Sequence, residues 1–262
     1  MRRDSSFCLR NRVLAALPSS EWRLIEPQLD WVELPPGALL QEAGVALQHV
    51  YFPVTAIVSL VSSMQDGASA EVAMVGNEGF VGVGAFMGAQ RALSSAMVQS
   101  GGHALRMTAG SLACHAWQSE SLMQQLLRYT HALLTHMAQT SVCNRHHALD
   151  QKLCRWILLN LNRRDGDEIA VTHEQLAGML GVRREGVTGS AMKLRKAGLI
   201  ECRRGHMSIL DRAGLEARSC ECYSVVQRAY DRLWASSATE LHGWSHARRH
   251  PSNGSGLMAA TA

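Results

Sequence analysis

The stretch Val171–Leu210 decides the fold: VTHEQLAGMLGVRREGVTGSAMKLRKAGLIECRRGHMSIL. It predicts two helices joined by a tight turn and followed by a β-hairpin. Thr172 and Gln175 have the spacing of a capping box at the start of the first helix. Gly181 follows the last apolar residue of that helix, at the place where a left-handed cap commonly ends helices. The sequence therefore predicts a short first helix between Thr172 and Gly181.

A second helix is expected from about Arg183 to Ala197. Its apolar positions fall on one face, and its first polar residues fall on the other. The apolar positions are Val187, Ala191 and Leu194, and the outward positions are Arg183, Arg184, Glu185 and Thr188. The hairpin Leu199–Leu210, turning at Arg204-Gly205, adds a wing. In a helix-turn-helix the second helix enters the major groove of DNA, so this stretch is interpreted as a DNA reader.

The distribution of charge supports this interpretation. Between Arg183 and Arg204 there are seven Lys or Arg and two Glu, a net charge of +5, whereas the whole chain carries +4. A cationic strip over an outward helix and a hairpin tip suits contact with phosphates. An ordinary solvated face is the alternative. The coincidence of the charge with the helix-turn-helix pattern favours DNA.

Composition indicates a folded protein with room for two domains, since 47% of its 262 residues are hydrophobic and 18% are charged. The seven cysteines are scattered and odd in number, which favours a reducing compartment over a disulfide framework. The apolar run Val13–Leu17 is too short for a signal peptide, and no run reaches the roughly 18 apolar residues of a membrane span. We therefore expect a cytoplasmic protein.

The N-terminal half predicts a β-structure after one or two short helices, of which one has Ser19 as its expected N-cap. From Trp31 onward short β-rich segments alternate with turns. Asp66-Gly67 predicts one hairpin, and Gly101-Gly102 predicts another. The pattern is typical of a small β-barrel or jelly roll. A glycine-rich loop, residues 76–95, is interpreted as a tight corner of the roll in preference to a phosphate cradle.

A long helix is expected from about Ser119 to His147. Apolar residues at three- and four-residue spacing suggest a seam against a second copy of the same helix, although a plain core helix is the alternative. The seam positions are Met123, Leu126, Leu127, Thr130, Leu133, Leu134 and Met137. A helix from Asp150 to Leu161 should pack under the helix-turn-helix through Leu153, Trp156, Ile157 and Leu159–Leu161. One or two further helices follow the wing, and the end of the chain has the composition of a disordered tail.

This order of elements resembles that of the Crp/Fnr family of bacterial transcription regulators. The resemblance is sharpest in four segments: CNRHHALDQKLCRWILLNLNRR, THEQLAGMLGVRREGVT, LRKAGLI and CECY. It implies an α+β fold with a cyclic-nucleotide-binding-like β-roll over residues 9–118 and a dimerisation helix over 119–147. A winged helix-turn-helix over 148–220 and a C-terminal helix with its tail over 221–262 complete the chain. It also implies a homodimer that binds near-palindromic promoter DNA, with RNA polymerase as a further partner.

In the family an Arg-Glu pair at the start of the recognition helix reads base edges, and here that pair is Arg184-Glu185. Arg can bind guanine O6 and N7 together, and Glu can accept from cytosine N4. Backbone contact or support of the recognition helix is expected from Thr172, Arg183, Thr188, Lys193, Arg203 and Arg204. Some members carry a second base-reading Arg four residues after the Glu, where this chain has Gly189. The half-site sequence therefore does not transfer from those members.

The β-roll lacks the residues by which family members hold a cyclic nucleotide. Val83 stands where they carry a Glu for the ribose hydroxyl, and Arg91 is followed by Ala92 and Leu93 instead of Ser or Thr. An apolar side chain leaves ribose hydroxyls unpaired, which is costly in a buried site. We therefore expect no cyclic AMP binding. The roll either senses an unidentified signal or serves to orient the dimerisation helix.

No metal, cofactor or catalytic site is expected. The iron–sulfur branch of the family needs several cysteines near the N-terminus, where Cys8 stands alone. Cys220 and Cys222 are too close together for a four-ligand cluster without distant partners, so packing is favoured. The adjacent His146 and His147 point in different directions. No catalytic triad, carboxylate pair or P-loop is present, which argues against an enzyme. The alternative function is a ligand-binding signalling module whose winged helix contacts another protein.

Overall fold

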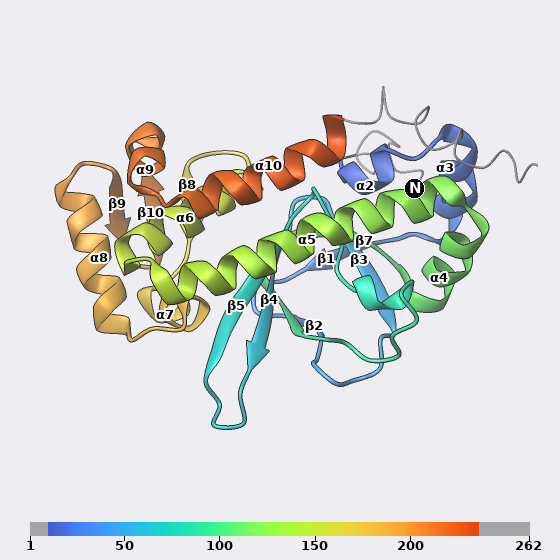
Figure 1. Cartoon of the computed structure of the whole chain (residues 1–262), viewed down its shortest axis with the longest axis horizontal. Helices are drawn as coiled ribbons and strands as arrows, with labels where there is room; N and C mark the ends of the chain where they lie inside the picture. The colour runs from blue at the N-terminus through green and yellow to red at the C-terminus, as the bar shows by residue number, and fades with distance from the viewer. Residues whose placement is uncertain (1–9, 236–262) are drawn as a thin grey trace, which may run out of the picture.

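The computed structural model describes residues 10–235 and has three parts (Figure 1). The long helix α5 (Glu120–His146) runs across the molecule. A β-roll lies against its first half, and a winged helix lies at its C-terminal end. Helix α10 (Glu221–Ala235) returns alongside α5. No helix in residues 10–235 is long and apolar enough to cross a membrane. The predicted tail and Cys8 lie outside the described residues.

The β-roll consists of two antiparallel sheets, with strand orders β1-β7-β3 and β2-β6-β4-β5. The strands of the roll are β1 (Asp30–Leu34), β2 (Leu39–Gln41), β3 (His49–Pro53), β4 (Ile57–Ser63), β5 (Ser69–Val75), β6 (Ser95–Ser100) and β7 (Gly102–Thr108). The short helix η2 (Val83–Ala85) lies between β5 and β6. Strands β4 and β5 form the hairpin that was predicted at Asp66-Gly67.

The hairpin predicted at Gly101-Gly102 is wrong. Strand β6 pairs with β2 and β4, whereas β7 pairs with β1 and β3, so the two glycines carry the chain from one sheet to the other. A Cβ on Gly102 would lie 2.6 Å from Oγ1 of Thr55 and 2.7 Å from the backbone nitrogen of Ala56. Glycine is therefore required here because two backbones approach closely, and the sequence alone does not distinguish this from a turn.

Residues of strands β4 and β5 pack into two separate cores. Val58 and Leu60 pack into the core of the roll, while Ile57 and Met74 pack into the core of the winged helix. Successive side chains of a strand point to opposite faces of the sheet, so one hairpin contacts both parts. The sheet therefore joins the roll to the DNA-binding unit through apolar packing.

The N-terminal helices are α2 (Arg12–Ala15), α3 (Ser19–Ile25) and the short η1 (Glu26–Gln28). Ser19 was expected to cap α3, but Pro18 occupies the N-cap position and no side chain caps this helix. Asn11 caps α2, and its buried amide also donates to the carbonyl oxygens of Pro53 and Gly79 at 2.9 and 2.8 Å. This asparagine anchors the start of the described chain to the roll.

Helix α4 (Ala109–Gln118) leads from the roll into α5, which Ser119 caps by accepting from the backbone N–H of Leu122. The single apolar seam predicted for α5 is wrong, because its residues divide between two faces. Leu126, Thr130 and Leu133 are buried within the protomer, and Met123 and Met137 are half-buried against the same core. Leu127 and Leu134 are exposed, as is Val142. We call Leu127, Leu134 and Val142 the outer stripe of α5.

The winged helix is built on α6 (Leu149–Leu161). Its other elements are β8 (Glu168–Ala170), α7 (His173–Leu180), α8 (Arg184–Lys196), β9 (Ile200–Arg203), β10 (His206–Ile209) and α9 (Arg212–Arg218). Leu153, Trp156 and Ile157 pack under the helix-turn-helix as predicted. Leu159 does not, because it points into the core of the roll, and the buried Asn160 accepts from Gln99 of β6 at 2.7 Å. Helix α6 thus contacts both parts of the protein.

Candidate nucleic-acid interface

The turn between α7 and α8 forms as the sequence predicts. The backbone N–H of Gln175 donates to Oγ1 of Thr172 at 3.2 Å, and Oε1 of Gln175 accepts from the backbone N–H of Thr172 at 2.9 Å. This capping box starts α7. Gly181 ends the helix in the left-handed region with φ of 63°. These two caps fix where α7 begins and where it ends.

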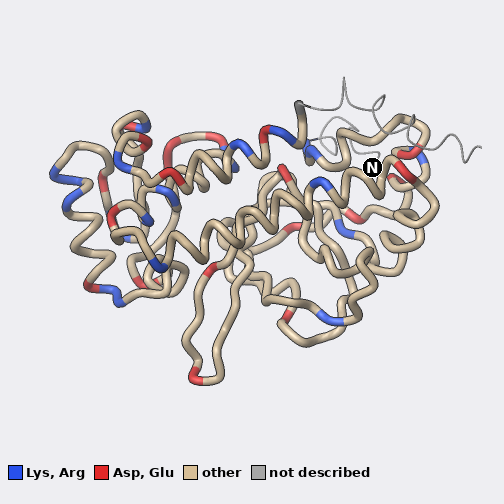
Figure 2. The backbone as a smooth tube through the Cα atoms, viewed as in Figure 1, with Lys and Arg blue, Asp and Glu red and all other residues tan. Residues whose placement is uncertain are grey.

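Helix α8 presents its predicted faces. Val187, Ala191 and Leu194 are buried in the core above α6. At the start of the helix Arg184 and Glu185 are exposed. Nε of Arg184 lies 4.0 Å from Oε2 of Glu174, a loose pair between two exposed side chains. Figure 2 shows Lys and Arg along this helix at one end of the molecule. The pair predicted to read bases is therefore accessible on the surface.

The wing brings further cationic residues next to the start of α8. Strands β9 and β10 turn at Arg204-Gly205, and β10 also pairs with β8. A hollow of about 340 Å³ lies between the wing and the first residues of α7 and α8. Four of the predicted contact residues line it: Thr172, Arg184, Arg203 and Arg204. This cationic hollow suits a phosphate group of a nucleic-acid backbone.

Two predicted residues are engaged within the winged helix. Oγ1 of Thr188 donates to the carbonyl oxygen of Arg184 at 3.1 Å and lies 3.0 Å from Nδ1 of His173, which joins α7 to α8. Lys193 donates to Asp150 of α6 at 3.0 Å. The hydrogen bond from Ser190 and the pairing with Lys193 lower the pKa of the Asp150 carboxyl. These contacts favour support of the recognition helix over phosphate contact for both residues.

Arg183 and Gly189 lie on the exposed side of α8. Arg183 occupies the N-cap position without a side-chain cap bond. A Cβ added to Gly189 would meet no atom within 4 Å. Packing therefore does not require a glycine at position 189. This glycine leaves open space on the face of the helix that carries Arg184 and Glu185.

Neither of the two aligned pocket positions offers a free polar group inside the β-roll. Val83 is half-buried at the start of η2. The guanidinium of Arg91 is exposed and donates to the carbonyl oxygen of Gly44 at 2.6 Å. Two glycines that follow β5 have a structural reason. A Cβ on Gly79 would overlap the ring of Tyr129, and the backbone of Gly82 adopts a φ of 101°, which favours glycine.

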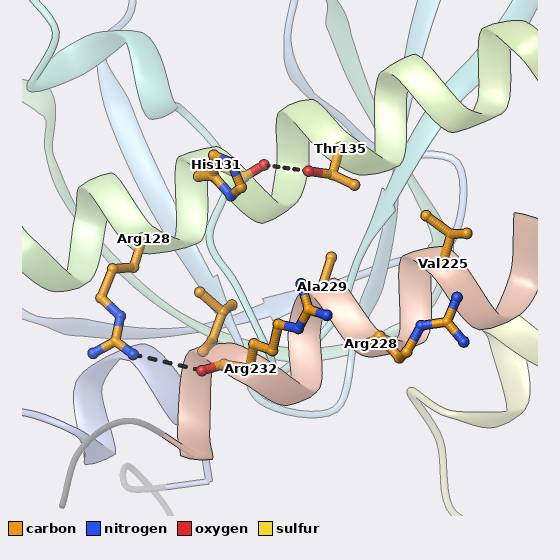
Figure 3. Close-up of a pocket in the computed structure, with 8 residues that line it drawn as sticks. Arg128, His131, Thr135, Val225, Arg228, Ala229 and Arg232 are labelled. Carbon is orange, nitrogen blue, oxygen red and sulfur yellow. Dashed lines mark hydrogen bonds between the residues drawn. The ribbon is translucent and has the colours of Figure 1, made fainter. Parts of the chain in front are cut away.

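A second hollow, of about 410 Å³, lies between α5 and α10 (Figure 3). Arg128 and His131 of α5 line one wall, and Arg228 and Arg232 of α10 line the other. Nη2 of Arg128 donates to the carbonyl oxygen of Arg232 at 3.5 Å. This groove is cationic and open, and it borders the outer stripe of α5 at His131.

Sequence reasoning missed the polar junction between the roll and the winged helix. Glu71 of β5 is buried there and accepts from Oγ of Ser59. Burial raises the pKa of the Glu71 carboxyl to about 7, and Ser59, Arg155 and Arg163 oppose this rise only in part. A buried ion pair joins Glu78 to Arg163 nearby. These residues come from distant parts of the chain, and no local pattern links them.

Comparisons with known proteins agree with this architecture. Residues 31–113 match the model of the cyclic nucleotide-binding domain, and residues 151–218 match that of the Crp-like helix-turn-helix domain. Together the two matches cover more than half of the chain. The Crp-like match points to transcription regulators, which are typically not enzymes. No curated protein sequence matches the chain.

Solved structures share the fold at low sequence identity. A Crp/Fnr-family transcriptional regulator from Eubacterium rectale has a TM-score of 0.64 and 15% identity, over 80% of this chain and 98% of its own. A CRP-family transcriptional regulator from Thermus thermophilus has a TM-score of 0.61 and 18% identity, over 72% and 96%. FixK2 from Bradyrhizobium japonicum has a TM-score of 0.59 and 14% identity, over 73% and 98%.

The two matched domains flank the long helix α5, and the start of α8 is exposed beside a cationic wing. By these features the chain belongs to the Crp/Fnr family of DNA-binding transcription regulators.

Proposed function

We propose that this protein is a homodimeric regulator that binds near-palindromic promoter sites through two copies of α8. The exposure of Arg184 and Glu185 at the start of α8, next to the wing residues Arg203 and Arg204, carries the proposal. Base edges in the major groove are reached by the first residues of a recognition helix, and backbone phosphates are reached by the flanking wing. Binding to chromosomal DNA would keep the protein in the cytoplasm.

The chemistry of the two base readers is complementary. The guanidinium of Arg184 can donate to both acceptors of a guanine, and the carboxylate of Glu185 can accept from the amino group of a cytosine. The pairing of Arg184 with Glu174 is long and exposed, so little free energy opposes its transfer to a base. Arg203 and Arg204 would then hold the backbone, which fixes the register of α8 in the groove.

The outer stripe of α5 supports the dimer. Leu127 and Leu134 are exposed and seven residues apart, and Val142 lies two turns farther along the same helix. Apolar side chains spaced seven or eight residues apart lie along one face, along which two parallel helices can pack. Such a dimer presents two winged helices related by a two-fold axis. Their half-sites are expected about one DNA turn, roughly 34–36 Å, apart.

The β-roll, in this proposal, responds to a signal other than cyclic AMP or serves to orient α5. Val83 offers no polar group to a ribose, and Arg91 is already bonded to Gly44 at the surface. Titration calorimetry with cyclic AMP and cyclic GMP tests this part. Micromolar binding of either nucleotide would contradict it.

Selection of bound fragments from a random DNA pool tests the proposal as a whole. The wild-type protein should enrich an inverted repeat with G·C pairs at symmetric positions. Fragments that carry only one half-site should bind at least tenfold more weakly. Enrichment of no sequence, or of single half-sites at full affinity, would contradict the proposal. Contact with RNA polymerase remains a prediction, to be tested by transcription from the selected site.

The salt dependence of DNA binding separates the proposal from a winged helix that binds another protein. DNA binding through phosphates weakens steeply as the salt concentration rises. A protein-binding surface does not need a cationic hollow of this kind. A measurement at two salt concentrations distinguishes the two. Weak binding to every DNA, with no dependence on salt, would favour the protein-binding alternative.

A further inference from the structure

The structure places four potential metal ligands together at the C-terminal end of α5. Cys143 and His147 are one helical turn apart on α5, and Cys220 and Cys222 come from the junction between α9 and α10, about 75 residues later in the chain. The Sγ atoms of Cys143 and Cys220 are 3.6 Å apart, and Nδ1 of His147 lies 3.4 Å from Sγ of Cys222. All four ligand atoms lie within 4.8 Å of one another.

From this geometry we propose that Cys143, His147, Cys220 and Cys222 bind one Zn²⁺ ion. Structural zinc sites are tetrahedral and commonly combine three cysteines with one histidine. With Zn–S bonds of about 2.3 Å, two thiolates of such a tetrahedron are about 3.8 Å apart, close to the separation found here. The cysteines are free thiols, and their sulfur atoms are far beyond the length of a disulfide bond.

Ordinary packing does not account for the cluster. Cys143, Cys220 and Cys222 are buried against one another, and they form a cluster separate from the apolar cores of the roll and the winged helix. A buried thiol normally packs as a small hydrophobe among aliphatic side chains. Three thiols and an imidazole nitrogen turned toward one common point instead form a donor set for a soft cation.

The surrounding groups orient the ligands as a metal site requires. Nε2 of His147 lies 3.3 Å from Oε1 of Glu221, so a proton on Nε2 leaves Nδ1 free to face the cysteines. A carboxylate behind a ligand histidine is a recurrent feature of zinc sites. On the other side Nε2 of Gln139 donates to Sγ of Cys222 at 3.1 Å, a bond that stabilises a thiolate. The neighbouring His146 is exposed and takes no part.

The position of the site suggests what the zinc does. Helix α5 ends at His146, and at its C-cap, His147, the backbone leaves the helical region before α6 begins. Two ligands precede this break, and the other two follow the whole winged helix. The ion therefore ties the end of the long helix to the end of the DNA-binding unit. It would hold α8 in a fixed orientation relative to α5.

The sequence predicted no metal site at His146 and His147 and left Cys220 and Cys222 as a separate pair. It could not join them, because only the return of the chain from α9 into α10 brings the second pair to the first. The one-turn spacing of Cys143 and His147, together with the Cys-x-Cys pattern, was the signal available in the sequence.

Metal analysis of the full-length, untagged protein tests the proposal without reference to DNA. The wild-type protein, purified without chelator, should hold one zinc per chain. Cobalt exchanged into the site should give the thiolate charge-transfer absorption and the intense ligand-field bands of a tetrahedral centre. The variants His147→Ala and Cys220→Ser should lose stoichiometric zinc. The matched controls His146→Ala, at the adjacent histidine, and Cys114→Ser, at an exposed cysteine, should keep it.

Two further variants keep the test decisive if a ligand variant fails to fold. His147→Cys replaces one zinc ligand by another and should retain zinc. Glu221→Gln removes only the orienting carboxylate and should weaken zinc affinity about tenfold in competition with a chromophoric chelator. Wild-type protein that holds no zinc and takes up none, equal zinc in the His147→Ala and wild-type proteins, or an iron centre in place of zinc would overturn the proposal.

Discussion

Nε of Arg163 lies 2.7 Å from Oε1 of Glu78, and this ion pair is buried where the β-roll meets the winged helix. Glu78 belongs to the turn after β5, and Arg163 follows the last residues of α6. The guanidinium also lies 5.4 Å from the ring centre of Tyr230 in α10. Three elements that are remote in sequence therefore meet at one charged contact, which fixes the roll, α6 and α10 relative to one another.

Removing one partner of this pair should destabilise the protein strongly. Glu78→Gln leaves a buried guanidinium without its counter-charge, and such losses cost about 3–5 kcal/mol. Urea unfolding measures the change. Glu216→Gln provides the control, because it breaks an exposed pair with Arg212 on α9 and should cost no more than about 0.5 kcal/mol. Equal stability of the two variants would show that the buried pair contributes no more than an exposed one.

The buried carboxyl of Glu71 should make stability depend on pH. Its pKa is raised from 4.5 to about 7 by burial, so the folded state holds the proton more tightly than the unfolded state. Stability is then lost as pH rises from about 4.5 to about 7, and it stays at the lower level above that range. Below about pH 4.5 Glu71 is protonated in both the folded and the unfolded state, so its contribution to stability no longer changes with pH.

The variant Glu71→Gln cannot ionise and should lack this slope. Relative to wild type, its free energy of unfolding should increase by about 2–3 kcal/mol between pH 5 and pH 8. Denaturant unfolding of both proteins at the two pH values measures the difference. Glu33→Gln, at an exposed position of β1, serves as the control and should show no such change. A difference between Glu71→Gln and wild type that is independent of pH would mean that Glu71 does not titrate in this range.

A charge in the outer stripe of α5 should disrupt the dimer. Leu134→Glu places a carboxylate at the middle of the proposed seam, opposite its own copy, where it would be desolvated and repelled. Analytical ultracentrifugation should show a dimer constant weakened at least tenfold. Leu93→Glu changes an even more exposed leucine in the loop before β6 and should leave association unchanged. A dimer that survives Leu134→Glu would place the interface elsewhere.

Local patterns were sufficient for the helix-turn-helix. Thr172, Gln175 and Gly181 set the ends of α7 by bonds within a few residues, so sequence and structure agree closely there. The hairpin at Asp66-Gly67 was predictable for the same reason. The errors fall where distant segments decide the outcome. Gly102 needs its small size because the backbone at Ala56 lies against it, a contact across the roll that no local pattern records.

The long helix shows the same limit. Its apolar residues follow one helical period but lie on two faces. One face packs against the core of its own protomer, and the other is exposed. Leu126 and Leu133 belong to the first, and Leu127 and Leu134 to the second. Because these positions are adjacent in sequence, periodicity alone merges them into one stripe. Local patterns also could not predict that α10 returns along α5 and buries Val226 and Tyr230 against the same core.

We propose that Arg184 reads bases while Arg203 holds the backbone, and binding of two variants to two DNAs tests this division of roles most directly. Fluorescence anisotropy would measure affinity for the selected site and for a scrambled site at two salt concentrations. Arg184→Ala should lose about 1–3 kcal/mol on the selected site and little on the scrambled one. Arg203→Ala should weaken binding to both alike and reduce the salt dependence. Equal losses on both DNAs for both variants would contradict the assignment.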